Sequence, residues 1–437
     1  MLRPNRLVYL LVAALLVVAM TAAACAPAPA PTPAPQPTAK PAGQPTAAPQ
    51  ATAVPPTAAP KPTEDPLKGL SEAQKKWLQA AELGPFAKEQ DWKAIEEAAK
   101  KEGKVVVYSA SSRIPDVAKS FEAAYPGIKV EGYDLGTVDT INKVREEAKA
   151  GAHVGDVFFA GDPATVLNDL LPKHLLWNFV PSDLASVIPK ELQEPLLVQR
   201  LGTRAIMYNS EVYKESPIKN WWDLTKPEWK GKVQIKDIFE SGENLNMFIT
   251  FIQHSAEVAA AYKDAFGKDL VLDKDCPNAG YQFMKDFLEN DPVFVGSDGD
   301  IAKNVGTKGQ KDPPIGEADG AKFRDVVAGK LAFNLVTDAK PTAVVFYQTY
   351  LAIIDQAPHP NAAKLMIRWM MGDQKGGQGY APFYVPGDYP SRTDMTPPPG
   401  APPYADLKAK SWFIDGVYCY ENGPKALDFW VANQRKK

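Results

Sequence analysis

Cysteine and histidine are scarce in this chain, which has 3 Cys and 4 His among 437 residues. The histidines are isolated, with no H-E-x-x-H or H-x-H spacing: His153, His174, His254 and His359. No C-x-x-C pair is present, so a zinc site built on local spacing is not expected. The sequence also lacks G-x-S-x-G, a Walker loop and a recognisable Ser, His and Asp arrangement. These absences predict a protein that binds without a cofactor and is not an enzyme.

Runs of basic residues are almost absent. The chain has 49 Lys and Arg against 52 Asp and Glu, a net charge of −3, and one basic run at Arg435–Lys437. A protein that binds nucleic acid usually concentrates Lys and Arg on one face. We therefore expect no nucleic-acid partner.

Long apolar runs are confined to the start of the chain. Arg3 and Arg6 precede an apolar run from Leu7 to Met20, and small residues follow it. A basic start, an apolar stretch and small residues before a cut site are typical of a secretory signal, here residues 1–24. The alternative is an uncleaved membrane helix, because this stretch approaches the ~20 apolar residues that a span needs.

Cys25 stands directly after three alanines at the predicted cut site. This arrangement resembles the lipobox of bacterial lipoproteins, with Ala22 in place of the usual leucine. Residues 25–66 are rich in Pro and Ala and have few large apolar side chains, so they cannot bury a core. The interpretation is an extracytoplasmic protein that is anchored to a membrane through lipid on Cys25 and held away from it by a disordered tether.

From about residue 67 onwards, the pattern of the chain is α/β. Short β-branched strands such as Lys104–Tyr108 alternate with amphipathic helices such as Val138–Ala150. This order predicts mixed or parallel sheets with helices on their faces and ligands beyond the carboxyl ends of the strands. The pattern restarts near residue 200. We therefore expect two lobes, residues 67–203 plus 337–437 with a C-terminal extension, and residues 204–336.

Two cysteines remain after Cys25. Cys276 and Cys419 form an even pair in a protein expected outside the cytoplasm, which favours a disulfide between distant parts of the chain. The alternative is two buried free thiols.

Four motifs, in order along residues 94–395, resemble the extracytoplasmic solute-binding proteins of ABC importers, in the branch that includes the ferric-iron-binding proteins. The motifs are EAAKKEGKVVVY at 97–108, WDL with PEWKGK at 222–232, APHPNAAK at 357–364 and YPSRTD at 389–394. The resemblance implies the two-lobed type II periplasmic-binding-protein fold, with crossing strands that let the lobes close on a small-molecule solute. It also implies ABC permease subunits as partners, and we expect a monomer.

One departure from the iron-binding members concerns their two adjacent tyrosines, which bind Fe³⁺. The corresponding stretch here, residues 293–306, has no tyrosine. Asp298 and Asp300 provide oxygen donors that suit a hard cation. Their D-x-D pattern lacks the rest of a calcium loop, and the alternative is a solvated turn. An Fe(III) or chelated-metal protein of the same family is the alternative function, and a secreted lipoprotein hydrolase is the rival from another class.

Two polar loops precede predicted helices and are the candidate binding loops. Helix N-termini and Arg side chains both suit anions. The alternative for each loop is an ordinary helix cap. The candidate residues in these loops are Ser109, Ser111, Ser112, Arg113, Ser241, Gly242, Glu243 and Asn244.

Four further side chains complete the predicted site. Arg113 and Arg392 are the expected anion clamps, with surface salt bridges as the alternative. Asp162 is expected to order the cleft or to bind an ammonium group, and its alternative is a helix cap. Tyr208 is placed to stack on the ligand, with core packing as the alternative. The sequence therefore predicts capture of a small anionic solute.

Overall fold

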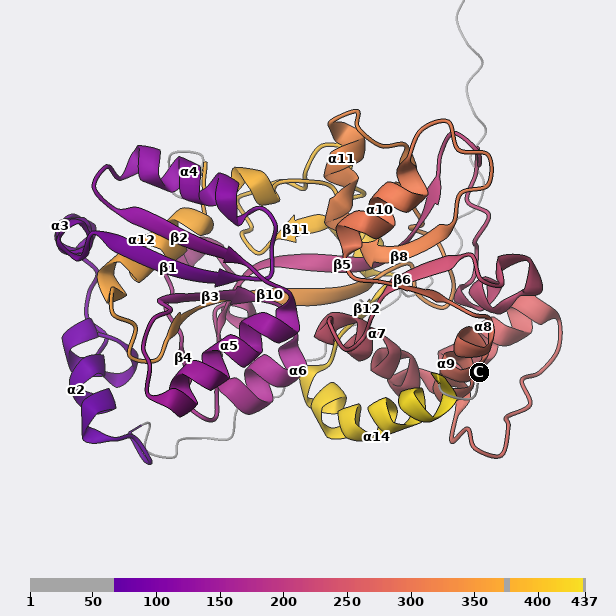
Figure 1. Cartoon of the computed structure of the whole chain (residues 1–437), viewed down its shortest axis with the longest axis horizontal. Coiled ribbons are helices and arrows are strands. Elements are labelled where there is room, and N and C mark those ends of the chain that lie inside the picture. The colour runs from indigo at the N-terminus through magenta and orange to yellow at the C-terminus, as the bar shows by residue number, and fades with distance from the viewer. Residues whose placement is uncertain (1–66, 373–377, 435–437) are drawn as a thin grey trace, which may run out of the picture. The chain divides into compact units, whose positions relative to one another are not determined.

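A computed structural model describes residues 67–372 and 378–434 (Figure 1). The predicted signal (1–24), the tether (25–66) and the lipidated Cys25 lie outside the described residues. Among the described residues, no helix combines the length and apolar character that crossing a bilayer requires.

One mixed sheet runs through the described part in the order β2-β1-β3-β10-β5-β8-β6-β7 (Figure 1). In its first half, β1 pairs in parallel with β2 and β3, and in its second half β6 pairs in parallel with β8 and β7. The long strands β5 and β10 are antiparallel to their neighbours and join the two halves. The strands are β1 (Lys104–Ser109), β2 (Lys129–Asp134), β3 (Val157–Ala160), β4 (Leu176–Trp177), β5 (Leu197–Asn209), β6 (Val233–Lys236), β7 (Val293–Val295), β8 (Ile315–Asp319), β9 (Phe333–Leu335), β10 (Val345–Ile354), β11 (Asp388–Pro390) and β12 (Trp412–Phe413).

Helices flank both halves of the sheet (Figure 1). They are α2 (Glu72–Ala81), α3 (Trp92–Glu102), α4 (Ile114–Ala124), α5 (Thr137–Ala150), α6 (Pro163–Thr165), α7 (Gly242–Gln253), α8 (Ser255–Phe266), α9 (Ala279–Glu289), α10 (Asp298–Gly306), α11 (Arg324–Val327), α12 (Pro360–Met370), α13 (Tyr404–Lys408) and α14 (Gly416–Gln434). Local signals set several of these bounds. Asp91 caps the start of α3, and Gly103 ends the helix in a left-handed conformation.

The first half of the sheet has a core of both aliphatic and aromatic side chains. The three valines of β1 are fully buried, as a strand covered on both faces requires. Val105 and Val107 pack with α4 and α12, whose apolar residues recur at helical spacing, and Val106 packs on the opposite face with α5. The segment before α3 is tied to this half because Gln74 of α2 donates to Asp355 Oδ2 at 3.0 Å.

The second half of the sheet has an aromatic core. Trp222 contacts Phe283 with ring centroids 5.1 Å apart, and Phe248 contacts Trp430 at 4.9 Å. Trp430 belongs to α14, at the end of the segment that was predicted to extend the first lobe. The structure corrects this detail: α14 packs on α7 and α9 of the second half, because its apolar side chains complete their core (Figure 1).

The two described cysteines are free and buried, so the predicted disulfide does not form. Cys276 lies in the loop before α9, and its sulfur is 3.9 Å from Asp275 Oδ1. Cys419 lies on α14, and its sulfur donates to the carbonyl of Asn246 at 3.6 Å. Each thiol therefore has its own polar contact inside the aromatic core.

Candidate functional site

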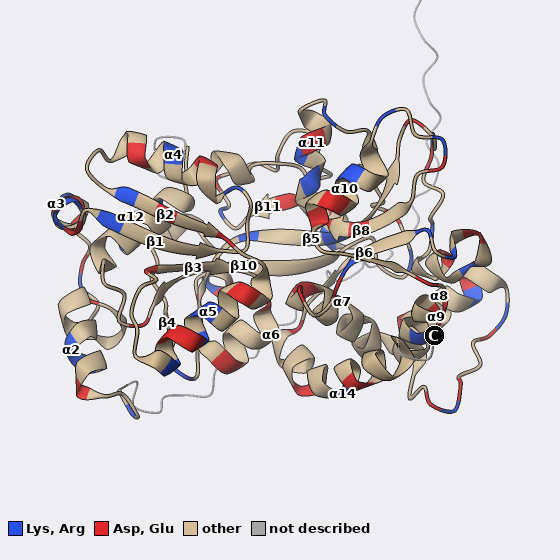
Figure 2. Cartoon of the chain, viewed as in Figure 1, with Lys and Arg blue, Asp and Glu red and all other residues tan. Residues whose placement is uncertain are grey.

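A polar cavity of about 60 Å³ lies where both halves of the sheet meet β5 and β10. Its lining includes six Lys and Arg side chains and three carboxylates: Arg113, Arg200, Arg204, Lys236, Lys322, Arg324, Glu243, Asp298 and Asp319. We call this cavity the cleft. Figure 2 shows Lys and Arg on β5, α10 and α11 close to Asp and Glu on α10.

The N-terminal ends of α4, α5, α7 and α10 all reach the cleft. The first three of these helices follow the carboxyl ends of the parallel strands β1, β2 and β6, and α10 follows β7. Free backbone N–H groups and the helix dipoles favour negative charge at this position. The architecture therefore gives the cleft a preference for anions before any side chain is counted.

The first predicted binding loop lies between β1 and α4. Ser111, Ser112 and Arg113 line the cleft. Ser109 does not line it and instead braces the loop, because its hydroxyl accepts from Ser111 N at 2.9 Å. Arg113 is the N-terminal cap position of α4.

The second predicted binding loop begins α7. Ser241 and Glu243 line the cleft, whereas Asn244 lies behind it and donates to Glu317 Oε2 at 3.1 Å. Gly242 allows a close approach, because a Cβ there would lie 2.4 Å from Asp162 Oδ2. Ser241 also caps α7 through Asn244 N, so the functional and capping interpretations of this serine coexist.

Three further predicted site residues, outside the two loops, lie away from the cleft lining. Asp162 caps α6 and accepts from Asn246 Nδ2 at 2.7 Å, which braces α7. Tyr208 is buried in the aromatic core, in agreement with its alternative interpretation. Arg392 pairs with Asp394 at 2.7 Å and donates to the carbonyl of Met371, so the structure does not place it as a clamp. Asp394 in its own loop and the backbone at the end of α12 satisfy its guanidinium.

Two buried arginines share one carboxylate at the β5 side of the cleft. Arg113 Nη1 lies 2.7 Å and Arg200 Nε lies 3.0 Å from Asp388 Oδ2, and all three side chains are at most 5% exposed. Both guanidinium groups also lie 4.9 Å from the ring centroid of Phe383. These contacts fix the orientation of both arginines before any solute arrives.

Arg204 has two carboxylate partners. Its Nε and Nη2 donate to the two oxygens of Glu317 at 2.8 and 2.9 Å, and its Nη1 donates to Asp298 Oδ1 at 2.8 Å. Burial lowers the pKa of Arg204, but the two carboxylates raise it more, so the guanidinium stays charged. We call Arg113, Arg200 and Arg204 the paired arginines.

The D-x-D pair does not form a cation site. Asp298 accepts from Arg204, and although burial raises its pKa, Arg204 and nearby lysines hold it well below the usual range. Asp300 lies in an exposed position on α10, where it accepts from Ser297 Oγ and pairs with Lys303 at 3.0 Å. The expected turn is instead the first turn of α10, which Ser297 caps.

Three cations line the cleft without an ion pair to any described residue: Lys236, Lys322 and Arg324. Arg324 Nη2 donates to Ser112 Oγ at 3.2 Å, and its buried Nη1 has no hydrogen-bond partner among the described residues. Burial lowers the pKa of Lys322, as expected for an ammonium group without a direct counter-ion. We call these three residues the open cations.

Two carboxylates in the cleft also lack an ion pair within the described residues. Glu243 Oε1 accepts from Thr137 Oγ1 at 2.7 Å, and this contact joins α5 of the first half to α7 of the second. Burial raises the pKa of Glu243. Asp319 Oδ2 accepts from the phenol of Tyr347 at 3.0 Å. The cleft thus offers hydrogen-bond acceptors beside its excess of cations.

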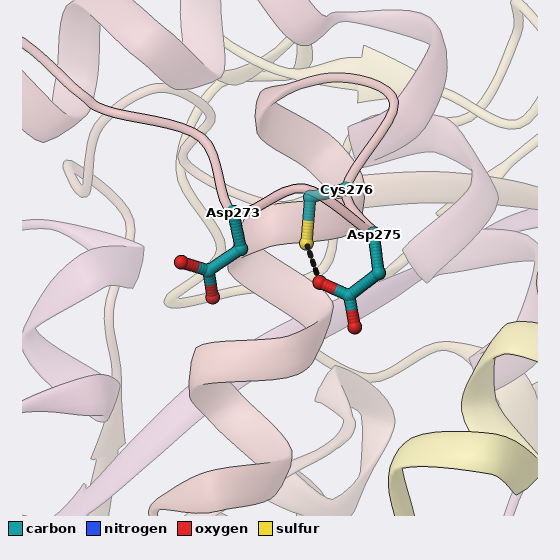
Figure 3. Close-up of side chains that lie close together, drawn as sticks. All are labelled: Asp273, Asp275 and Cys276. Atoms are coloured by element: carbon teal, nitrogen blue, oxygen red, sulfur yellow. Dashed lines mark hydrogen bonds between the residues drawn. The ribbon is translucent and has the colours of Figure 1, made fainter.

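Outside the cleft, an acidic cluster lies in the loop before α9 (Figure 3). Asp273, Asp275 and Cys276 bring two carboxylates and a thiol together. Lys285 Nζ lies 2.8 Å from Asp273 and 2.9 Å from Asp275, so an ammonium group already serves both carboxylates. Burial raises the pKa of the Cys276 thiol to about 12, which opposes metal binding through sulfur. This cluster is a salt-bridged loop.

The sequence interpretation missed Arg200, Lys236, Lys322 and Arg324, and it treated Arg204 only as the start of a strand. The two arginines of β5 carried a usable signal, because charged residues inside a buried apolar strand need partners. Lys322 and Arg324 follow β8 in the plain sequence GAKFR, which has no such signal. The fold brings them to the cleft.

Comparison with known proteins identifies the family of this chain. A family model described as bacterial extracellular solute-binding protein matches residues 87–376. A relative, the spermidine/putrescine-binding periplasmic protein 1 of Haemophilus influenzae, is 23% identical over 328 residues, which cover 72% of this chain and 84% of the relative.

Two solved structures share the architecture. The periplasmic binding protein AfuA of Actinobacillus pleuropneumoniae, with fructose-6-phosphate bound, matches with a TM-score of 0.61 and 19% identity over 77% of this chain and 99% of AfuA. Iron-bound HitA of Pseudomonas aeruginosa matches with a TM-score of 0.57 and 18% identity over 76% of this chain and 99% of HitA. At these identities the likeness shows the fold, and the predicted type II periplasmic-binding-protein fold is confirmed.

Proposed function

We propose that this chain, which belongs to the bacterial extracellular solute-binding proteins, captures a small anionic solute in the cleft. Members of this family bind solutes outside the cytoplasm for ABC importers and are not enzymes. The observation that carries the proposal is the set of open cations, since Lys236, Lys322 and Arg324 line the cleft without an ion pair among the described residues. A solute that carries phosphate or carboxylate would supply their missing counter-charge.

The charge of the cleft speaks against a polyamine solute. Three of its six Lys and Arg side chains are paired with Asp388, Glu317 and Asp298, which leaves three open cations beside the two carboxylates without an ion pair, Glu243 and Asp319. A polyamine would bring several positive charges to a site that already has an excess of them, and like charges disfavour binding. The name of the Haemophilus influenzae relative therefore does not transfer as a substrate.

Direct binding of Fe³⁺ through phenolate oxygens is also disfavoured. Tyr347 is the tyrosine in the cleft lining, and its hydroxyl donates to Asp319. Burial, reinforced by Asp319, raises its pKa well above the usual value of 10.0, so the phenol keeps its proton. A metal carried by an anionic chelator is still compatible with the cleft, because the chelator supplies the negative charge.

Titration calorimetry tests the proposed solute class. We expect fructose 6-phosphate or inorganic phosphate to bind, and neutral fructose and spermidine to bind at least tenfold more weakly or not at all. Lys322→Met should weaken phosphate binding at least tenfold, and the control Lys303→Met, at a side chain 69% exposed, should leave it unchanged. Tight spermidine binding with no anion binding would refute the proposal.

The membrane anchor is a separate part of the proposal. We infer that Cys25 is lipidated and that residues 25–66 tether a monomeric binding domain near its permease, on the sequence features described above. Metabolic labelling with palmitate tests the lipid: the natural chain should take up label, and Cys25→Ser should not. Equal labelling of both chains would refute lipidation at this cysteine and leave the solute class untouched.

A further inference from the structure

A second cavity has a volume of about 390 Å³ and shares no lining residue with the cleft. It is bounded by the end of α2, the connection to α3, one face of α3, residues 178–180 and the start of α12. Its volume falls within the about 300–1,000 Å³ that is typical of small-molecule pockets. Ala80, Glu82, Leu83 and Gly84 in its wall precede residue 87, where the family match begins. The cavity is therefore partly built from a segment outside the shared family region.

One part of the cavity wall is apolar, beside polar and charged residues. Leu83, Ile95 and Phe179 are each at most 8% exposed, and Ala94, Ala98 and Val180 continue the same surface. Such a wall favours the apolar body of a ligand through the removal of its surface from water.

Lys364 of α12 places an ammonium group in this wall. Its side chain lines the cavity although the residue is only 4% exposed, and its Nζ lies 5.8 Å from the ring centroid of Phe179. It has no hydrogen bond or ion pair with any described residue. Burial lowers its pKa, an effect that Glu82 and Glu102 partly offset from a distance. An ammonium group on a largely buried side chain that reaches a cavity gains from a counter-ion bound there.

The acidic groups near the cavity are engaged elsewhere or exposed. Glu82 pairs with Lys88, and Asp91 caps α3 by accepting from Lys93 N and Ala94 N. Glu102 accepts from the backbone of Asn361 and Ala362 at the start of α12. Glu89 lies in an exposed position on the rim. Lys364 is thus the charged group of the wall whose partner is missing.

We propose that this cavity binds a small amphiphilic monocarboxylate, whose carboxylate pairs with Lys364 and whose apolar body packs on Leu83, Ile95 and Phe179. The site is separate from the cleft, so it is a second ligand site of the chain. A fatty acid and an aromatic acid share this chemistry, and probes of each kind distinguish the two sources.

Calorimetry on the natural chain with octanoate, benzoate and octan-1-ol tests the proposal. We expect at least one of the two carboxylates, octanoate or benzoate, to bind. If octanoate binds, octan-1-ol should bind at least tenfold more weakly, because it lacks the negative charge. Lys364→Met keeps the packing of the stem but removes the charge, and should weaken carboxylate binding at least tenfold. Lys93→Met, an exposed lysine on α3, is the charge-matched control and should bind as the natural chain does.

Ala98→Phe supplies a steric test, because it fills the cavity without altering Lys364 and should abolish carboxylate binding. Circular dichroism melting curves should show that each variant is folded; Lys364→Met is expected to melt no lower than the natural chain, since it removes a buried charge. No binding of either carboxylate to the natural chain, equal binding to Lys364→Met, or undiminished binding to folded Ala98→Phe would each overturn the proposal.

Discussion

The paired arginines and the open cations face the same cleft but differ in what holds them. Arg113, Arg200 and Arg204 are at most 4% exposed as residues and contact buried carboxylates. Lys236, Lys322 and Arg324 come from the second half of the sheet, are partly exposed and have no ion pair with a described residue. The fold neutralises the three buried arginines with carboxylates, whereas the cations at the edge of the cleft can pair with a solute.

The paired arginines and the open cations have different roles. Arg200 and Arg204 hold β5 to β11 and β8, because their partners Asp388 and Glu317 lie on those strands, and Arg113 holds the start of α4 to β11. They therefore stabilise the crossing region and shape the electrostatic field of the cleft. The open cations keep unused donors, so their loss should weaken solute binding more than folding.

The largest effect is expected from Arg204→Met. This change leaves Glu317 buried without its bidentate partner, and breaking a buried pair in this way typically costs about 3–5 kcal/mol of stability. Urea unfolding measures it, with Lys303→Met as the control, since a surface pair is worth about 0–1 kcal/mol. If both variants unfolded at the same urea concentration, the paired arginines would not be structural.

A smaller effect, on binding and not on folding, is expected from Arg324→Met. A hydrogen bond to a charged group contributes about 1.5–3 kcal/mol, so phosphate binding should weaken about 10- to 100-fold. Arg392→Met is the matched control, because its guanidinium is satisfied by Asp394 and the carbonyl of Met371, and it should change affinity less than about twofold. Calorimetry with phosphate on both variants shows which of the two arginines contributes to phosphate binding. A large loss for Arg392→Met alone would restore the clamp that the sequence suggested.

The smallest effect concerns pH and Glu243. Burial raises the pKa of this carboxyl above its ordinary value of 4.5, so it loses its proton only as the pH rises past that raised value. The carboxylate then repels an anion in the cleft. Glu243→Gln should therefore bind sulfate about 3- to 10-fold more tightly than the natural chain at a pH above that raised pKa.

Sulfate suits this measurement because it does not titrate in this range. The difference between the two chains should shrink as the pH falls toward the raised pKa of Glu243, where the natural side chain becomes neutral. A ratio of affinities that stays constant with pH would show that Glu243 does not sense the solute charge. Glu89→Gln, at an exposed carboxylate outside the cleft, is the control and should show no such difference.

Local patterns in the sequence were enough for much of the fold. The β-branched run before Ser109 and the helical spacing from Val138 placed β1 and α5 to within one residue. The two polar loops could be placed at the carboxyl ends of strands for the same reason, and residues of both loops line the cleft. The helices α8 and α9 were not identified, because their burial depends on an aromatic core that residues from α7, α9 and α14 build together.

The sequence by itself determined the α/β order and the polar loops at strand ends, because hydrophobic periodicity, caps and turns act over a few residues. Only the tertiary structure decided which charges are paired. Arg204 meets Glu317 across 113 positions and Arg113 meets Asp388 across 275, while Arg392 is satisfied two residues away. Ion pairing depends on distance in space, and chain neighbours do not reveal it. The two cavities also depend on the tertiary structure, because each is lined by segments that come together only in the folded chain.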